Sequence, residues 1–526
     1  MLITDILTEN ARMYETRTAL IEREPAINKR REITWALFDK HANCISNFLI
    51  QKGIKKGDRI IQLMTNCLEW LPVYFGILRT GALAVPLNFR FSSEKIELCS
   101  MTSTPKLFIF GEEFIERLES IKKTLDQTVS AYLFTGPENI MPVWAIHYNE
   151  IFNHPDWNHP DVPITIEDDA ALYFTSGTTG MPKAVLLTHK NLSFACEVEN
   201  RHHKQTHDDN FLCIPPLYHT GAKMHWFGNF LVGAKSVLLK GVKPEWILEA
   251  VSEEKITIVW LLVPWAHDII IAIENKDVDL ARYNLSTWRL MHIGAQPVPP
   301  SLIKKWKKLF PDHDYDTNYG LTESTGPGCI HLGMENIHKV GAIGKPGFGW
   351  EYDIVDGEMK HLPPGESGEL VVKGDGVMKA YFKNPEATRE TLVNGWLKTG
   401  DIARCDESGF VWLVDRKKDI IITGGENIYP VEIENFFMTH DKIQDVAVIG
   451  YPDERLGEIV IAIILVKKGQ SITEEEVRAF SQHLPRYKRP RKIIFGDVPR
   501  NPTGKIEKPR LRRKYIHLPD DLRKTL

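Results

Sequence analysis

Apolar and polar positions alternate along the first third of the chain between a strand-like and a helical period. The strand-like run Ile60–Met64 follows a turn at Gly57-Asp58-Arg59 and precedes a helical stretch around Glu69–Leu78. Alternation of this kind is typical of α/β proteins with a mainly parallel sheet. Further apolar runs have the length expected of buried strands: Ala170–Phe174, Ala184–Leu187, Ile256–Val263 and Trp288–Ile293. The pattern therefore predicts an α/β architecture for this part of the chain.

The pattern changes in the last third of the chain, where short β-like segments dominate. A run of five charged residues, Asp415–Asp419, separates the apolar segments Phe410–Val414 and Ile420–Ile422. Such a run is usually a solvent-exposed face, but between two strands it also suits a hinge between domains. Beyond it, the pattern predicts a helix and a closing βαβ-like unit. We therefore expect an α/β fold: a large N-terminal domain of αβ sheets plus a β-subdomain, residues 1–415, and a small mobile α+β C-terminal domain, residues 416–526.

The composition adds limits on the class of protein. The chain has 526 residues, too many for one compact core, and its formal net charge of −4 gives no argument for nucleic acid or a membrane surface as a partner. Seven scattered cysteines without a C-x-x-C pattern are typical of reduced thiols and disfavour structural zinc. The most apolar window, Ile258–Ile273, contains Pro264 and Asp268 and is too short to cross a bilayer. Acidic residues near the N-terminus disfavour a signal peptide, so we expect a soluble cytoplasmic protein.

The loop Thr175-Ser176-Gly177-Thr178-Thr179-Gly180-Met181-Pro182-Lys183 lies between two of the predicted strands. It offers backbone N–H groups, hydroxyl donors and one cation in a small volume, which is the set that a polyphosphate requires. It is not a Walker loop, because its glycines are three apart and a strand-like run follows it. A simple hairpin turn is the alternative interpretation. We prefer a nucleotide-phosphate loop, which the remaining motifs must support.

Three further segments carry side chains that suit a nucleotide and a metal ion. His219 follows a double proline and is placed to face a cavity, although most single histidines are structural. The small-residue turn Gly294-Ala295-Gln296 allows close backbone approach to a flat ligand. Further along, Tyr319 can stack on a purine, Thr322 can donate to a phosphate, and Glu323 can hold Mg²⁺. A strand-to-helix turn with threonine as its N-cap is the alternative for this last group.

The C-terminal third adds acidic, glycine-rich and basic motifs. Asp401 follows Thr-Gly at a predicted strand end, where it suits a bidentate contact to two ribose hydroxyls or is a plain turn residue. Thr423–Pro430 contains a glycine turn before a predicted helix. The segment Arg486–Lys514 is strongly basic and contains Asn501–Lys505. Its charge indicates either solubility or a phosphate-rich partner.

In this order, the motifs resemble those of the AMP-forming acyl-CoA synthetases in the adenylate-forming superfamily, which also contains luciferases and the adenylation domains of peptide synthetases. The resemblance covers nearly the whole chain and rests on five segments: Thr175–Lys183, Tyr319–Glu323, Gly395–Asp401, Arg416–Pro430 and Pro502–Lys505. It implies two half-reactions. A carboxylate is first joined to ATP with release of pyrophosphate, and the acyl group then passes to the thiol of CoA with release of AMP.

The resemblance implies the candidate catalytic residues. Lys505 would place its cation between the carboxylate and the α-phosphate, where negative charge is crowded during adenylation. Thr322 would donate to a phosphate, and His219 would form the gate beside the carboxylate pocket. Glu323 would hold Mg²⁺.

The resemblance also implies the contacts to ATP. The loop Thr175–Lys183 would bind the β- and γ-phosphates. Tyr319 and the turn Gly294-Ala295-Gln296 would enclose the adenine. Asp401 would bind the ribose hydroxyls, and Arg416 would lie on the ribose–phosphate side.

The second half-reaction requires a thiol at the position that the lysine occupied. Members of the superfamily rotate the C-terminal domain about one hinge residue, which corresponds to Lys418. The turn at Gly424 and Gly425 would then line the pantetheine tunnel of CoA, where the ligand approaches the backbone closely. The chain departs from the family pattern at Ala184 and Ala380, where glycine is usual, and neither change removes a functional group.

The acyl pocket is expected to include Ala222, Trp226, Trp265 and Gly320. Two tryptophans suit a compact tail, although both indoles packing in the core is an equal alternative. We predict a small-to-medium apolar monocarboxylate, such as an aromatic, alicyclic or short unsaturated acid, with a medium-chain fatty acid as the second choice.

Other members of the superfamily are the main alternatives. A peptide-synthetase adenylation domain would carry an aspartate near the segment that matches Pro216–His219, where this chain has Leu-Tyr-His. A luciferase-like oxygenase would share every motif. A binding module without activity would predict loss of Lys505, Glu323 or Asp401, and all three are present. We expect an acyl-CoA ligase, monomer or homodimer, with only small molecules as partners; the direction of the reaction stays open.

Overall fold

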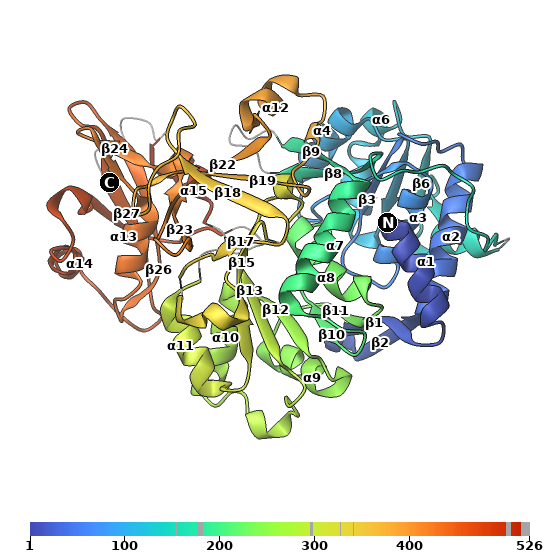
Figure 1. The fold of residues 1–526 in the computed structure, drawn as a ribbon, viewed down its shortest axis with the longest axis horizontal. Coiled ribbons are helices and arrows are strands. Elements are labelled where there is room, and N and C mark those ends of the chain that lie inside the picture. Colours follow the sequence, from blue (N-terminus) through green and yellow to red (C-terminus); the bar gives the residue numbers. More distant parts are fainter. Residues whose placement is uncertain are drawn as a thin grey trace.

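The computed structural model describes residues 1–153, 155–175, 182–294, 298–326, 328–339, 341–500 and 506–516. Within these ranges the strands form two large α/β sheets, two smaller antiparallel sheets and one C-terminal sheet. Figure 1 shows the two α/β sheets in blue to green, and the segment after residue 420 in orange and red at the opposite end. Yellow strands of the β-subdomain lie between them.

The first α/β sheet contains the phosphate loop. Its strands are, in spatial order, β20 (Ala380–Tyr381), β9 (Lys183–Thr188), β8 (Asp169–Thr175), β4 (Leu83–Pro86), β3 (Arg59–Leu63), β5 (Leu107–Phe110), β6 (Ala131–Phe134) and β7 (Ile146–His147). Pairing is parallel from β8 to β7 and antiparallel between β8, β9 and β20. The predicted strands on both sides of the loop are therefore confirmed as β8 and β9.

The helices of this region are α1 (Ile3–Met13), α2 (Trp35–Gln51), α3 (Trp70–Arg79), α4 (Ser93–Ser103), α5 (Ile115–Glu119), α6 (Lys122–Leu125) and α7 (His189–His203). Helix α3 is apolar on nearly all sides, and every one of its residues is buried, as expected of a helix inside the core. Gly76 allows α3 to lie against α2, because a methyl group there would lie 2.6 Å from Cγ2 of Ile45.

The second α/β sheet has the strand order β14 (Asp314–Asp316), β13 (Leu290–Gly294), β12 (Ile258–Leu262), β10 (Asn210–Cys213), β11 (Lys235–Leu239), β1 (Thr18–Glu24) and β2 (Lys29–Thr34). All neighbours pair in parallel except β1 and β2. Its helices are α8 (Thr220–Leu231), α9 (Pro244–Glu254), α10 (Val263–Glu274) and α11 (Pro300–Leu309). Because parallel strands end at one edge, the segments after β10, β12 and β13 meet there.

The β-subdomain holds the sheet β18 (Trp350–Val355), β19 (Gly368–Gly374), β22 (Trp396–Cys405) and β21 (Leu392–Val393), with β23 (Val411–Arg416) on β22 and α12 (Pro385–Thr391) beside it. A small antiparallel sheet joins β15 (Asn318–Tyr319), β16 (Ile330–His331) and β17 (Lys345–Pro346). The 3₁₀ turn η6 (Thr322–Ser324) follows β15. These strands extend the core of the large α/β sheets toward the C-terminal part of the molecule.

The C-terminal sheet has the order β25 (Glu426–Ile428), β24 (Ile421–Thr423), β27 (Gly457–Val466) and β26 (Ile443–Asp453), with β28 (Lys492–Phe495) on β27. Its helices are α13 (Pro430–Phe437), α14 (Glu474–Ser481) and α15 (Lys508–Ile516). The predicted βαβ unit is present, because β27 and β28 are parallel and α14 connects them. The strand before it, β26, forms an antiparallel hairpin with β27.

The proposed domain boundary at residues 415–416 falls at the end of β23. The chain leaves the β-subdomain at Arg416, passes through the 3₁₀ turn η8 (Lys417–Asp419) and enters the C-terminal sheet at Ile421. A separate hydrophobic core lies around Ile421, Phe437 and Val448 in that sheet. All seven cysteines are free thiols. In the described ranges, no helix combines the length and the apolar character that a membrane span requires.

Candidate active site

The carboxylate of Asp401 connects three strands of the β-rich region. Asp401 on β22 lies opposite Arg416 on β23, and Nε of Arg416 lies 2.8 Å from Oδ1 of Asp401. The hydroxyl of Tyr319 on β15 donates to Oδ2 of Asp401 at 2.5 Å. Asp401 raises the pKa of Arg416, while burial and Asp401 together raise the pKa of Tyr319. The structure thus brings together the phenol of Tyr319, the carboxylate of Asp401 and the guanidinium of Arg416. In the sequence these residues belong to three separate motifs.

Glu323 is connected to the end of the phosphate loop through one tyrosine. The hydroxyl of Tyr381 on β20 donates to Oε1 of Glu323 at 2.8 Å. The ammonium of Lys183, at the start of β9, lies 4.6 Å from the centre of the Tyr381 ring. A carboxylate with one oxygen in this hydrogen bond can still offer the other to a hard cation, so the group fits the role expected for Mg²⁺. Sequence reasoning did not assign a role to Tyr381.

The N-terminus of α8 lies beside this group. His219 is the N-cap of α8, and its Nδ1 accepts a hydrogen bond from the backbone N–H of Gly221 at 3.2 Å. The hydroxyls of Thr220 and Thr322 lie 3.5 Å apart, so the first turn of α8 meets η6. A helix N-terminus that carries hydroxyls favours an anion through the helix dipole and its backbone N–H groups. The arrangement therefore suits the carboxylate and α-phosphate that adenylation brings together.

Some of the predicted site lies outside the described residues: Ser176–Gly180 of the phosphate loop, Ala295, Gln296 and Lys505. The described residues next to these segments lie at strand ends, as the predicted site requires. Thr175 ends β8 opposite Lys183, and Gly294 ends β13 at the carboxyl edge of the second sheet.

The predicted hinge and tunnel residues lie in the turns around β24. Lys418 is the middle residue of η8, between the β-subdomain and the C-terminal sheet. Gly424 and Gly425 form the exposed turn between β24 and β25, with φ angles of 58° and 88°. These angles are in the left-handed region, which favours glycine at both positions.

Two of the predicted acyl-pocket residues lie in an aromatic core. Ala222 and Trp226 on α8 are fully buried, and the Trp226 ring packs 4.9 Å from Phe230 and 6.3 Å from Phe75. The packing alternative therefore describes Trp226 better than contact with a substrate. Trp265 on α10 is half-buried and packs against both large cores.

The first turn of α8 packs against β12 at the carboxyl edge of the second sheet. A methyl group at Gly221 would lie 3.3 Å from Nδ1 of His219 and 3.4 Å from Cη2 of Trp260. The ring of His225, one turn further along α8, stacks on Trp260 with centroids 4.5 Å apart. Sequence reasoning did not single out Trp260 or His225, because a buried-strand pattern does not tell which buried side chains contact one another.

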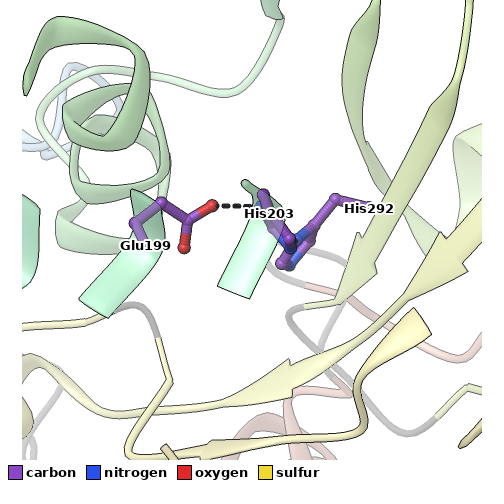
Figure 2. A group of neighbouring side chains, drawn as sticks. All are labelled: Glu199, His203 and His292. Atoms are coloured by element: carbon purple, nitrogen blue, oxygen red, sulfur yellow. Dashed lines mark hydrogen bonds and ion pairs between the residues drawn. The ribbon is translucent and has the colours of Figure 1, made fainter. Parts of the chain in front are cut away.

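A buried ionic network lies next to His225, whose ring centroid is 4.3 Å from that of His292 (Figure 2). His203 at the end of α7 forms an ion pair with Glu199, one turn earlier, with Nδ1 and Oε1 2.7 Å apart. Its Nε2 lies 2.7 Å from Oδ2 of Asp316 on β14 and 2.9 Å from Nδ1 of His292 on β13. Glu199, His203 and His292 are all fully buried. The network therefore connects α7 to β13 and β14 of the second sheet.

Two imidazoles and a carboxylate are also a donor set that suits zinc, since ligand atoms of Glu199, His203 and His292 lie within 4.8 Å of one another. Zinc–ligand bonds of about 2.1 Å in tetrahedral geometry separate the ligand atoms by roughly 3.3 Å. The contacts of His203 at 2.7 Å are shorter and are those of an imidazolium between two carboxylates. We therefore interpret the network as structural.

The charges of the network follow from these contacts. Burial opposes a charge on His203, but the carboxylates of Glu199 and Asp316 outweigh it and raise the pKa of His203 to about 10. Burial likewise opposes the charge on Glu199, but the imidazolium lowers the pKa of Glu199 to about 2. Burial lowers the pKa of His292, and neighbouring histidines lower it further, so His292 is neutral.

This network predicts a pH dependence of stability. The unfolded chain releases the proton of His203 near the ordinary histidine pKa of 6.5, whereas the folded chain keeps it until about pH 10. The stabilisation is therefore complete below pH 6.5 and is lost as the pH rises toward 10. We expect His203→Gln to lower stability at neutral pH by about 3 kcal/mol and to flatten the decline of the melting temperature between about pH 7 and 9.5. The exposed His207→Gln is the control; equal slopes in both variants would contradict the assignment.

Comparison with known proteins agrees with this geometry. The family model described as AMP-binding enzyme matches residues 7–382, and the model of the AMP-binding enzyme C-terminal domain matches residues 432–505. The long-chain-fatty-acid–CoA ligase FadD13 of Mycobacterium tuberculosis is 31% identical over 94% of both chains. Feruloyl-CoA synthase of Amycolatopsis sp is 33% identical over 92% of this chain and 94% of the relative. The crystal structure of the anthranilate CoA ligase AuaEII with anthranoyl-AMP matches with a TM-score of 0.88 and 27% identity, covering 100% of this chain and 98% of that chain.

The chain thus belongs to the AMP-binding enzyme family and has the fold of the adenylate-forming superfamily. Within it, the relatives are CoA ligases, and this chain is an AMP-forming acyl-CoA ligase. The fold class and the enzyme class predicted from the sequence are confirmed.

Proposed function

We propose that this ligase activates a compact carboxylic acid by adenylation and transfers its acyl group to CoA. The observation that carries the proposal is the contact between η6 and the first turn of α8, where the hydroxyls of Thr322 and Thr220 lie 3.5 Å apart. This contact joins the residues assigned to the nucleotide to those assigned to the acid. Asp401 with Tyr319 and Arg416 forms the nucleotide side. The N-terminus of α8, with His219 and Thr220, forms the acid side.

In the first half-reaction, a carboxylate oxygen attacks the α-phosphorus and the bond to pyrophosphate breaks. Thr322 and the first turn of α8 donate to the oxygens at that centre, and Lys505 balances their charge. Asp401 accepts from the ribose hydroxyls, while Tyr319 and the segment at Gly294 border the adenine. Mg²⁺ held by Glu323 would neutralise phosphate charge when bound.

In the second half-reaction, the CoA sulfur attacks the acyl carbon and AMP leaves with the bonding electrons. The turn at Gly424 and Gly425 would approach the pantetheine arm after rotation about Lys418. A cytoplasmic location and a monomeric or homodimeric state, both expected from the sequence, belong to the same proposal. Either direction of the reaction is compatible with this chemistry.

A panel of carboxylic acids tests the proposal. CoA-dependent release of AMP would be measured with benzoate, cyclohexanecarboxylate, crotonate, octanoate and palmitate at equal concentration. We expect a higher kcat/KM for the ring acids than for palmitate, because Trp260 closes the space beside Gly221. A preference for palmitate would contradict the compact pocket. If no acid of the panel gave AMP release, the proposal that these acids are substrates would be wrong.

A further inference from the structure

The turn that carries Thr322 and Glu323 ends in a strained backbone. Thr325, which follows η6, has a φ angle of 63° and a ψ angle of 10°. These angles lie in the left-handed region, which a β-branched side chain disfavours. Within the described ranges, Thr104 is the only other β-branched residue with such a φ angle. Strain of this kind persists only where surrounding contacts hold it, and Thr325 is 1% exposed.

The hydrogen bonds of the turn are those of a Schellman motif. The N–H of Thr325 donates to the carbonyl oxygen of Thr322 at 3.0 Å, and the N–H of Gly326 donates to that of Leu321 at 2.8 Å. Glycine is the usual residue at the left-handed position of this motif, because it has no Cβ. Threonine at position 325 therefore costs the turn stability, which indicates that its side chain supplies a contact that glycine cannot make.

The hydroxyl of Thr325 connects the turn to the β-subdomain. Its Oγ1 donates to the carbonyl oxygen of Gly376 at 2.5 Å. Two residues further along, the N–H of Met378 donates to the carbonyl oxygen of Glu323 at 2.8 Å. The same segment leads into β20, where the hydroxyl of Tyr381 donates to Oε1 of Glu323. Three hydrogen bonds between this segment and the turn thus fix the place of Glu323.

The other side of the turn contacts α8. Gly326 lies against the first turn of that helix, since a methyl group on it would lie 3.1 Å from Cβ of Thr220 and 3.2 Å from the backbone nitrogen of Gly221. The hydroxyls of Thr220 and Thr322 lie 3.5 Å apart. A shift of the turn would therefore move Thr322 relative to the helix end at which the carboxylate and the α-phosphate are proposed to meet.

We propose that Thr325 is a positioning residue for adenylation: the hydrogen bond from its hydroxyl to Gly376 holds the left-handed turn that places Thr322 and Glu323. This inference rests on the proposed function, in which these two residues serve the phosphate and Mg²⁺. Thr325 acts through them, and its strained backbone is retained because the hydroxyl is needed at this position.

Thr325→Val tests the hydroxyl, since valine keeps the size and the branching of threonine. We expect it to lower kcat for acid-dependent ATP–pyrophosphate exchange by about 10- to 100-fold, because a small misplacement of groups at the reacting centre has an effect of that size. The Mg²⁺ concentration for half-maximal exchange should rise, while KM for the acid should change little. Transfer of the acyl group from a supplied acyl-adenylate to CoA should stay near the wild-type rate. Thr325→Ser keeps the hydroxyl and should exchange pyrophosphate near the wild-type rate.

Thr325→Gly separates positioning from stability. Glycine removes the backbone strain and the hydroxyl together, so this variant should melt at a higher temperature than Thr325→Val. We expect its exchange activity nevertheless to be as low as that of Thr325→Val. Exchange that recovers together with the melting temperature in Thr325→Gly would assign residue 325 to the stability of the turn alone and would overturn the inference.

Thr104→Val is the matched control. Thr104 also has a left-handed backbone, with a φ angle of 47° at the end of α4, and its hydroxyl accepts from Nη2 of Arg59 at 2.6 Å. Because α4 carries none of the predicted site residues, this variant should leave both half-reactions unchanged. An equal loss of exchange in Thr104→Val would show a general effect on the fold and contradict the proposal.

Two results distinguish this inference from the proposed function. Exchange at the wild-type rate in Thr325→Val would refute the positioning role and leave the proposed function intact. Absence of exchange in the wild-type enzyme with every acid of the panel would contradict the proposed function and the inference together.

Discussion

Replacement of Lys505 by alanine is expected to reduce acid-dependent ATP–pyrophosphate exchange by about 100- to 1,000-fold. Adenylation brings a carboxylate against a phosphate, and the assigned cation has its largest effect where both charges meet in the transition state. The same variant should transfer the acyl group from a supplied acyl-adenylate to CoA at a rate close to wild type. The reason is that, in the proposed mechanism, the second half-reaction uses a different face of the C-terminal domain.

Two measurements separate this role from a general loss of structure. Lys468→Ala, which removes an exposed lysine from the turn after β27, should leave both half-reactions unchanged. The melting temperature of Lys505→Ala should equal that of the wild type. Pyrophosphate exchange at the wild-type rate in Lys505→Ala would refute the assigned role.

Lys418→Pro is expected to separate the two half-reactions in the opposite way. Lys417 on one side forms an ion pair with Glu369 of β19 at 3.0 Å, and Asp419 on the other side forms one with Arg512 of α15 at 2.9 Å. Lys418 therefore lies where the contacts of the chain change from the β-subdomain to the C-terminal domain. Residues at such a boundary absorb the change in φ and ψ when domains rotate.

Proline at position 418 fixes φ and also restricts the residue before it. We expect pyrophosphate exchange to stay within a few-fold of wild type and thioester formation to fall by about 100-fold, because a small misplacement of the thiol has an effect of that size. Lys418→Ala is the control: it removes the ammonium but leaves the backbone free, and it should form thioester normally. Equal loss of both half-reactions in Lys418→Pro would contradict the hinge.

The local elements were largely predictable from the sequence. The two apolar runs around the phosphate loop are β8 and β9, and the pattern predicted a strand after the loop instead of a helix. The helical stretch expected around Glu69–Leu78 is α3, which covers Trp70–Arg79. These elements follow from the period of apolar positions and from turn residues, both of which are local properties of the chain.

Pairing between distant segments was less predictable. The sequence suggested a βαβ unit for the last strands, but it did not predict that β26 forms an antiparallel hairpin with β27. The apolar pattern of a strand does not specify which other strand it pairs with. Likewise, Tyr319 and Asp401 are 82 residues apart. The family resemblance implied that both contact ATP, but the sequence did not predict the hydrogen bond between them.

What the sequence by itself determined is the kind of protein: the alternation of strands and helices, and a set of motifs in one order that defines an ATP-dependent ligase. Only the tertiary structure decided which neighbours each buried side chain has. Trp226 and Trp260 are both buried, yet Trp226 packs among phenylalanines whereas Trp260 stacks on His225 and lies against the first turn of α8. Periodicity records that a residue is buried, whereas its neighbours depend on how distant segments pack, and that packing decides between a core residue and a contact to substrate.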